Sequence, residues 1–145
     1  MNHYSSEEMK RYNYLFWETD AAYHEAALKL GLADSAMKIL YAVCDNGESC
    51  RLQDVCRRSG LSKQTVNSAL RKLENEGVVY LEHAGAKAKR VRLTESGKSL
   101  VHRTVSRIMQ IENAIFEAWP QKDVETYLEL TERFLVGLQE KIPEL

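Results

Sequence analysis

A stretch with two chemically different faces, LSKQTVNSALRKLENE at residues 61–76, constrains the fold more than any other part of the chain. Ser62 suits a helix N-cap, because its hydroxyl can accept a hydrogen bond from an N–H of the first turn. Gly77 follows the last charged turn, where helices commonly end. Apolar residues recur at helical spacing on one face, and they are Val66, Ala69, Leu70 and Leu73. We therefore predict a helix that buries one face in a core.

The opposite face of this helix carries amides, hydroxyls and cations, with acids only at its C-terminal end. Its residues are Ser62, Lys63, Gln64, Thr65, Asn67, Ser68, Arg71 and Lys72. Amide side chains can pair two atoms of adenine, and arginine can pair two atoms of guanine. Lysine and serine can hold phosphates. The pattern predicts a DNA-reading face, and an ordinary amphipathic surface helix is the alternative that the helix alone leaves open.

The charge distribution favours the DNA-reading interpretation. The whole chain has a net charge of -1, which argues for no particular partner. Residues 51–92, however, hold ten Lys/Arg against four Asp/Glu, and the rest holds ten against seventeen. A basic middle between acidic ends predicts that only the middle meets a polyanion.

The segment before this helix completes a recognisable motif. A helix is predicted near Asp34 to Asp45, Cys50 is placed in a very short strand, and a short helix is predicted over Leu52 to Arg58. Ser59-Gly60 turns the chain into the helix described above. Two short helices joined by a tight glycine-containing turn form a helix-turn-helix, whose second helix normally enters the major groove.

After Gly77 the apolar period changes to that of strands. Val79 and Leu81 alternate on one run, Val91 and Leu93 alternate on the next, and residues 84–86 suit a hairpin tip. The returning strand carries Lys87, Lys89, Arg90 and Arg92. A cationic hairpin beside a recognition helix is a wing that contacts the DNA backbone or minor groove. The alternative is an edge hairpin that lysine protects from aggregation.

Long helices are predicted on both sides of this winged region. The stretch Ser5-Ser6-Glu7-Glu8 can cap the first, with Ser5 and Glu8 at capping-box spacing, and this helix runs to about Leu30. Thr94 caps a second that runs from Glu95 to about Trp119, and the last spans about Lys122 to Lys141. Their apolar stripes need a partner, which the first helix or a second subunit can supply. The predicted fold is mainly α with a small β wing: residues 34–94 form the winged helix, and residues 1–30 and 95–145 form dimerisation helices.

Other function classes find little support in the sequence. The four histidines lack metal-ligand spacing, no catalytic triad is local, and we predict neither an enzyme nor a metal or cofactor. No apolar run approaches membrane-spanning length and no signal peptide opens the chain. Three cysteines without paired spacing fit a reducing cytoplasm. Cys44 and Cys56 fall on inward helical positions, and Cys50 is predicted to be the one that is partly exposed.

Residues 50–98 resemble the winged-helix core of the MarR family of bacterial transcription regulators, most specifically in GLSKQTVNSALRKLENEGVV and RVRLTESGK. The resemblance extends to the flanking helices. It implies a homodimer joined through its terminal helices, binding a pseudo-palindromic operator with two wings, most simply as a repressor. It also implies that a small molecule or an oxidant modulates DNA binding. Where the family's wing carries an Asp and an Arg two residues apart, this chain has Gly85 and Lys87.

Two sets of site residues follow. The DNA-contacting set is the helix face named above together with Lys87, Lys89 and Arg90 of the wing. By resemblance, a pocket for a small aromatic ligand should lie between the first and second helices, the start of the fifth helix and the winged domain. The side chains expected near it are Trp17, Tyr23, His24 and Tyr41. Core or interface packing is the alternative role for these four side chains. A protein-docking module without sequence-specific DNA binding, and a cysteine redox regulator, are the alternative functions.

Overall fold

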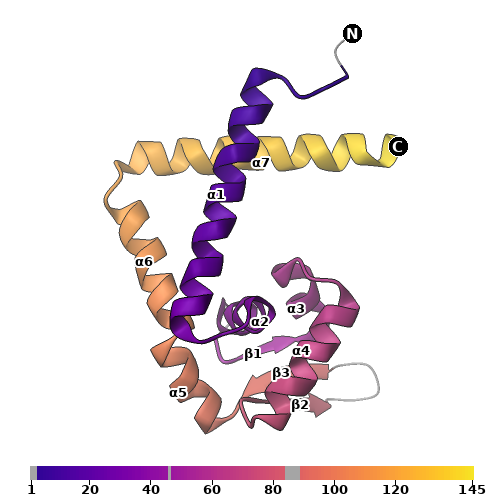
Figure 1. Ribbon diagram of the computed structural model, residues 1–145, viewed down its shortest axis with the longest axis vertical. Coiled ribbons are helices and arrows are strands. Elements are labelled where there is room, and N and C mark those ends of the chain that lie inside the picture. The colour runs from indigo at the N-terminus through magenta and orange to yellow at the C-terminus, as the bar shows by residue number, and fades with distance from the viewer. Residues whose placement is uncertain (1–2, 46, 84–88) are drawn as a thin grey trace. The chain divides into compact units, whose positions relative to one another are not determined.

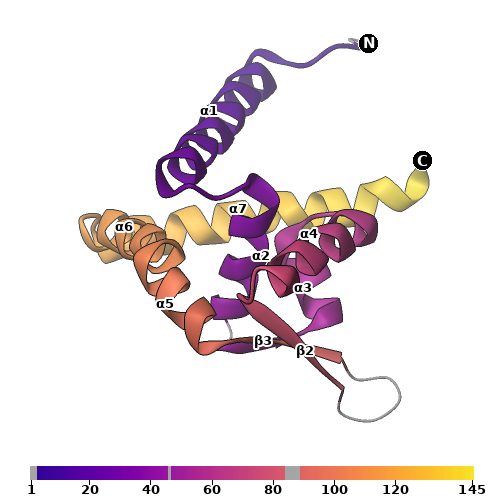
Figure 2. The ribbon, with the colours of Figure 1, turned by 60° about the horizontal axis from the view of Figure 1, so that its bottom comes forward.

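The computed structural model describes residues 3–45, 47–83 and 89–145 (Figures 1 and 2). The chain divides into two compact units, Met1–Ser106 and Arg107–Leu145. Helices predominate and a small antiparallel sheet accompanies them, which confirms the predicted fold class.

The winged-helix part of the first unit is built from three helices and three strands. The helices α2 (Asp34–Asp45), α3 (Leu52–Ser59) and α4 (Lys63–Asn75) pack on one another. The strands β1 (Ser49–Arg51), β2 (Val79–His83) and β3 (Lys89–Leu93) form a sheet in the order β1-β3-β2. Both pairings are antiparallel, with Cys50 opposite Val91 and Leu81 opposite Val91 on the other side. The short strand predicted around Cys50 is therefore confirmed, and it joins the sheet beside the wing.

The core of this part comes from every one of these elements. The periodic apolar residues of α2 and α4 face inward, and those of β2 and β3 alternate with the exposed positions, as strand geometry requires. The side chains that are completely or almost completely buried include Ile39, Leu40, Val43, Cys50, Val55, Val66, Leu70 and Val91. Burial of a leucine or valine stabilises a fold by about 1.5–3 kcal/mol, so this part of the chain holds its own core.

Thr94 and Gly97 fix the base of the wing to the next helix, α5 (Glu95–Arg103). The Thr94 hydroxyl oxygen accepts a hydrogen bond from the Gly97 N–H at 2.9 Å, which confirms the predicted N-cap. The Thr94 N–H in turn donates to the carbonyl of Val78 at 3.1 Å. A Cβ atom added at Gly97 would lie 2.0 Å from that same carbonyl oxygen. Only glycine therefore lets α5 approach the start of β2 this closely.

The N-terminal helix α1 spans Glu7–Leu30. Within the predicted capping stretch the cap is Ser6, because the Ser6 Oγ accepts the Met9 N–H at 3.1 Å. This start puts Glu7 and Glu8 together in the first turn, where the helix dipole favours acids. Gly31 ends the helix with φ 73°, a left-handed conformation that suits glycine. Of the residues of α1, only Ala27 is fully buried.

The long helix predicted over Glu95 to Trp119 is wrong, because the chain breaks at Thr104 into α5 and α6 (Val105–Glu117). Thr104 leaves helical geometry, with φ -125° and ψ -86°. Its hydroxyl donates to the carbonyl of Leu100 at 2.8 Å, and a threonine that bonds back in this way bends helices. The residues next to Thr104 include neither glycine nor proline. The helical period of the apolar residues continues through the break, so the sequence predicted one helix.

The second unit contains the rest of α6 and α7 (Gln121–Lys141), followed by a single 3-10 turn over Ile142–Glu144. The Trp119-Pro120 stop is confirmed, since α6 ends before it and α7 begins after it. Phe116, Trp119 and Tyr127 join the two helices in an aromatic cluster, with ring centroids 5.2–6.0 Å apart. No residue of α7 is fully buried.

Candidate nucleic-acid interface

The helix-turn-helix is formed by α3, a tight turn and α4. Gly60 ends α3 with φ 69°, and the Ser62 Oγ accepts the Thr65 N–H at 3.1 Å, which confirms the predicted cap of α4. The Ser62 hydroxyl also donates to the Thr65 Oγ1 at 2.8 Å. Because its oxygen caps the helix and its proton is engaged, Ser62 is committed to structure. The Thr65 hydroxyl keeps its own proton for an acceptor outside the chain.

The two faces of α4 are as different in the structure as in the sequence. Val66, Leu70 and Leu73 are buried, and Ala69 is half-buried. All the predicted DNA-contacting residues of the helix itself are exposed, and they are Lys63, Gln64, Thr65, Asn67, Ser68, Arg71 and Lys72. The hydrophobic face therefore fixes the orientation in which the polar face is presented.

The exposed face of α4 offers donors that the protein itself does not use. Among the described residues, no hydrogen bond or ion pair engages the side chains of Gln64, Asn67 or Arg71. Other arginines behave differently, since Arg58 pairs with Asp45 at 3.2 Å and Arg92 pairs with Glu82. A guanidinium with no internal partner can present its planar fork to a base edge or a phosphate.

Lys63 occupies the first turn of α4, and no acid accompanies it there. A cation at this end opposes the helix dipole and typically destabilises a helix by about 0.3–1 kcal/mol. The arrangement suits a site that binds anions, because the cation and the dipole then attract the same ligand.

The wing places its cations differently. Lys89 is exposed at the start of β3. Arg90 is half-buried, and its Nη2 donates to the Ser49 Oγ at 3.2 Å, across to β1. Residues alternate along a strand, so Arg90 lies on the opposite face of the sheet from Lys89 and Val91. Lys87 and the predicted tip at residues 84–86 lie outside the described residues.

A groove with a volume of about 340 Å³ opens where α3 and α4 meet the strands β1 and β3. Three cations, two amides and two less polar side chains line it, and they are Arg51, Lys63, Lys89, Gln53, Asn67, Leu52 and Cys56. No carboxylate is among them. Sequence reasoning assigned no site role to Arg51 or Gln53. The sequence did contain one signal. Arg51 stands at the N-cap of a helix, although its side chain cannot accept the hydrogen bond that a capping residue usually accepts.

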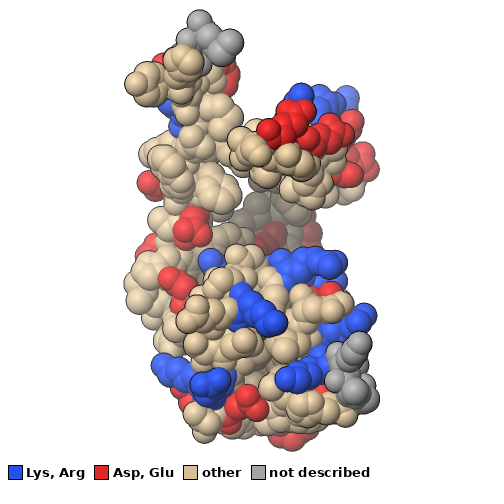
Figure 3. Space-filling view, turned by 90° about the vertical axis from the view of Figure 1, so that its right-hand side faces the viewer, with Lys and Arg blue, Asp and Glu red and all other residues tan. Residues whose placement is uncertain are grey.

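Figure 3 shows Lys and Arg spread over the face that carries α3, α4 and the wing, with Asp and Glu sparser among them. The positive charge counted over residues 51–92 is therefore gathered in space as well as in sequence. Such a face attracts a polyanion and steers its approach.

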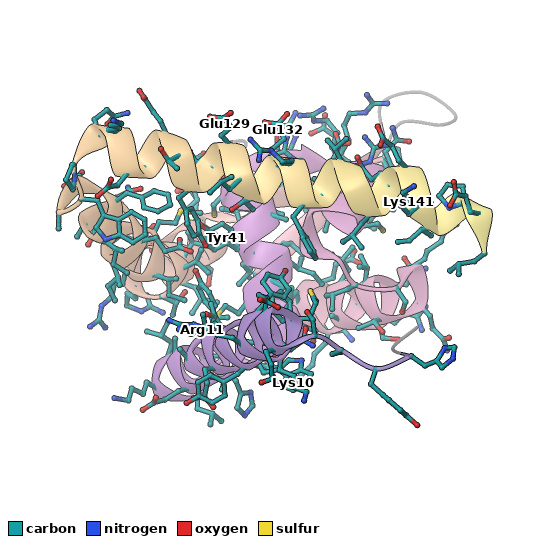
Figure 4. All side chains as sticks on the ribbon, turned by 90° about the horizontal axis from the view of Figure 1, so that it is seen from above. Lys10, Arg11, Tyr41, Glu129, Glu132 and Lys141 are labelled. Atoms are coloured by element: carbon teal, nitrogen blue, oxygen red, sulfur yellow. The ribbon has the colours of Figure 1, made fainter. Side chains whose placement is uncertain are left out.

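The predicted ligand-pocket residues lie on α1 and α2, with Tyr41 on α2 visible in Figure 4. Trp17 is 66% exposed, Tyr23 and His24 are exposed, and Tyr41 is half-buried. The His24 Nδ1 lies 2.7 Å from a carboxylate oxygen of Asp34, which ties the end of α1 to the start of α2. Tyr23 and His24 lie on the C-terminal half of α1 and Tyr41 on α2, whereas Trp17 lies almost two helical turns before Tyr23 on α1.

The cysteine prediction is wrong in one respect. Cys50 is completely buried, with 0% of its surface exposed, because it faces the core from the central register of β1. Cys44 and Cys56 are half-buried. Burial raises the pKa of the Cys44 thiol to about 11, and the nearby carboxylates of Glu48 and Asp45 add to the shift. A thiol with this pKa is a poor nucleophile at neutral pH.

In the part of the chain that the structure describes, no group of three His, Cys, Asp or Glu side chains could hold a metal ion. No helix there has the length and apolar character that crossing a bilayer demands.

A short helix-turn-helix with an antiparallel hairpin beside its second helix defines a winged-helix fold. Residues 30–90 match the model of the MarR family. The match shows that the winged-helix region of this chain is similar to that family.

Solved structures share the fold over nearly the whole chain. A MarR family regulator from Neisseria meningitidis is 15% identical with a TM-score of 0.84, covering 96% of this chain and 99% of that one. MepR from S. aureus, in its DNA-binding conformation, is 21% identical with a TM-score of 0.73, covering 88% and 98%. BpsR from Bordetella bronchiseptica, whose DNA binding is regulated by 6-hydroxynicotinic acid, is 19% identical with a TM-score of 0.66, covering 92% and 98%. None of the curated proteins matches the sequence.

Proposed function

We propose that the chain is a homodimeric, cytoplasmic repressor that reads a pseudo-palindromic operator through α4. The observation that carries the proposal is the outward face of α4, where amides and Arg71 are exposed without internal partners over a buried apolar face. A helix of this kind fits the major groove, where each base pair presents a distinct pattern of donors and acceptors.

Within this function, α4 and the wing have separate roles. Gln64, Asn67, Ser68 and Arg71 read base edges, since they share the outermost face of the helix. Lys63, Lys72 and Lys89, together with the Thr65 hydroxyl, hold the phosphates beside it. Arg90 is restrained by Ser49, so its contribution is to the local potential and to a backbone contact at the edge of the wing. Ser62 acts through the cap that orients Lys63 and Thr65. We assign Lys87 to the phosphates, in keeping with its place in the wing sequence.

The second subunit is proposed from the apolar surfaces of the flanking helices. In α1, Tyr14, Leu15, Phe16 and Trp17 are each more than half exposed, and α7 exposes Tyr127, Leu128, Phe134, Leu135 and Leu138. A chain on its own rarely leaves such faces in water. A second copy covers the same faces by two-fold symmetry, and two wings then meet two half-sites of the operator.

A small aromatic ligand that releases the operator is the finer part of the proposal. Regulation of DNA binding by 6-hydroxynicotinic acid in BpsR supports it. Tyr23, His24 and Tyr41, with Trp17 further along α1, are the side chains proposed to meet such a ligand. If a broad panel of aromatic acids neither weakens operator binding nor raises the melting temperature, this part of the proposal fails.

The experiment that tests the DNA-binding function compares a duplex selected from a random pool with an unselected duplex. Arg71→Ala is expected to weaken binding to the selected duplex by about 1–3 kcal/mol and to leave unselected binding nearly unchanged. Arg133→Ala is the matched control, because Arg133 is exposed on α7 and pairs with Glu129. A chain that binds neither duplex at low salt would be a protein-docking module. Equal losses on both duplexes would mean that Arg71 holds a phosphate.

A further inference from the structure

Arg51 stands where its charge costs the fold stability. It ends β1 and lies opposite Arg90 across the β1–β3 ladder. Like charges opposite each other in a ladder destabilise the pairing. Glu82 is the register partner of Arg90 on the other side, but its carboxylate is bound by Arg92. Among the described residues no acid pairs with Arg51 or Arg90, so only a group from outside the chain can offset their repulsion.

Two helix starts add cations to the same place. Arg51 is the N-cap of α3 without a capping hydrogen bond, and Lys63 opens α4. A cation at the N-terminus of a helix opposes the helix dipole. Both side chains line the groove described above, called the basic groove from here on, as do Gln53, Asn67 and Lys89. No carboxylate of the described residues lines it, so one anion there would offset all of these costs.

The position of the basic groove identifies the anion. A helix in the major groove and a wing at the neighbouring minor groove have one sugar-phosphate strand between them, because that strand is the wall that separates the two DNA grooves. The basic groove lies at this place, since Lys63 and Asn67 border it from α4 and Lys89 borders it from β3. A DNA phosphate is therefore the anion that this location favours.

We propose that the basic groove seats a phosphate of the operator backbone, and that Arg51 anchors this phosphate and so fixes the register of α4. A guanidinium can bind two phosphate oxygens at once, whereas a lysine acts as a point charge. At the wing position where the MarR family carries an arginine, this chain has Lys87. The planar anchor of this chain comes from the end of β1 instead. The inference rests on the proposed binding of DNA through α4.

Arg51→Gln tests the anchor, because it removes the charge and keeps much of the side chain. It is expected to weaken binding to selected and unselected duplexes alike by about tenfold, and to lower the log–log salt slope by about one. Arg57→Gln is the matched control, since it removes the same charge from an exposed position of α3 outside the basic groove. It should change neither quantity. Lys87→Gln should weaken binding less than Arg51→Gln does.

A double-mutant cycle locates the contact on the DNA. Neutral methylphosphonates replace the phosphates of the selected duplex one at a time, and each duplex is titrated with the original chain and with Arg51→Gln. At the phosphate seated in the basic groove the two losses should not add, because each change removes the same contact. At every other phosphate they should add.

Folding is checked by the melting temperature without DNA. Arg51→Gln should melt no lower than the original chain, because it removes the repulsion from Arg90. A lower melting temperature would overturn the claim that the charge of Arg51 is uncompensated. Gln53→Ala, in the first turn of α3, is a second variant that should weaken both duplexes by a smaller factor.

Three binding results would overturn the anchor. They are equal duplex binding by Arg51→Gln and the original chain, losses that add at every methylphosphonate, and a larger loss for Lys87→Gln than for Arg51→Gln. Inorganic phosphate that binds the chain through Arg51, while duplex binding ignores this residue, would assign the basic groove to a free anion. Each of these results leaves DNA binding through α4 standing. A chain that binds no duplex at low salt refutes the proposed function itself, and the anchor with it.

Discussion

The helices α4 and α7 both carry an apolar stripe, but they use it in different ways. In α4 the stripe is covered within the chain, since Val66, Leu70 and Leu73 are buried. In α7 no residue is fully buried, and Phe134 and Leu135 remain exposed. The same periodicity therefore describes a helix whose apolar stripe is covered within the chain and a helix whose apolar stripe is largely exposed.

The difference separates what this chain does alone from what it does as an assembly. The winged-helix part has its own core and presents the polar face of α4 with no help from elsewhere. The helices on either side carry their apolar residues outward, so their stabilisation has to come from another surface. Changes to α4 should therefore act locally, and changes to α7 should depend on protein concentration.

The largest effect should follow deletion of the chain from Val124 onward. The loss removes most of α7 and uncovers the aromatic cluster at Trp119, so we expect loss of the dimer and a poorly folded chain. Because a linked pair of half-sites gains about 10²–10⁴ in affinity, operator binding should fall by at least that factor. Sedimentation and operator titration measure both effects.

A point substitution tests the same interface without removing a helix. Leu135→Asp, on the exposed stripe of α7, should produce a monomer whose helical content is close to that of the original. If the intact chain is a folded monomer at micromolar concentration, the apolar stripe of α7 is not covered by a second subunit, and the proposed difference between α4 and α7 is wrong.

The next effect concerns Leu70, which is 2% exposed, and Leu128, which is 51% exposed. Leu70→Ala should destabilise the fold by about 2–5 kcal/mol, because it leaves a cavity in a packed core. Leu128→Ala should do little to a monomer, but it should lower the melting temperature of the dimer at low protein concentration. Denaturant and thermal unfolding at two protein concentrations would distinguish them, and a concentration-independent loss for Leu128→Ala would contradict an intersubunit role.

Local rules predicted the winged helix well. Ser62 and Thr94 cap the helices expected of them, and Gly60 takes the left-handed turn that the motif requires. The change of period after Gly77 predicted both strands of the wing, and the register pairs Val79 with Leu93. Each of these features depends on residues close in sequence, where capping, turn geometry and periodicity determine the structure.

The errors lie where a local rule had two solutions or where contacts between distant residues decide. Ser5 and Ser6 were both able to cap α1, and the first-turn acids favour Ser6. The break at Thr104 depends on a side-chain bond to Leu100, which periodicity does not detect. Cys50 is buried because β1 pairs with β3, far along the chain. The groove lined by Arg51 and Gln53 forms only when four separate elements, β1, α3, α4 and β3, are placed together.

A smaller effect is expected from the charges on α4. Lys63→Ala should weaken binding to selected and unselected duplexes alike and should flatten the log–log salt dependence by about one counterion. Lys122→Ala on α7 is the matched control, since Lys122 is also an exposed lysine near a helix start, and it should change neither quantity. Titrations at several salt concentrations give the slopes. An equal change for Lys122→Ala would mean that net charge, and not position on α4, governs binding.

The smallest effect is expected at the cysteines, where we predict no redox control. The raised pKa of Cys44, about 11 against an ordinary value of 9.0, keeps its thiol protonated at neutral pH. Because the folded-state pKa lies above the unfolded one, the protonated thiol contributes stability that is fully present below about pH 9 and is lost as the pH rises through about 11. Removing the thiol in Cys44→Ser should therefore reduce the loss of stability between these two pH values.

Stoichiometric peroxide at pH 7 should leave operator binding unchanged, because Cys50 is buried and Cys44 is protonated. Loss of binding in peroxide, reversed by a reductant and abolished in Cys44→Ser or Cys50→Ser, would show that one of these thiols becomes accessible in solution and acts as a sensor.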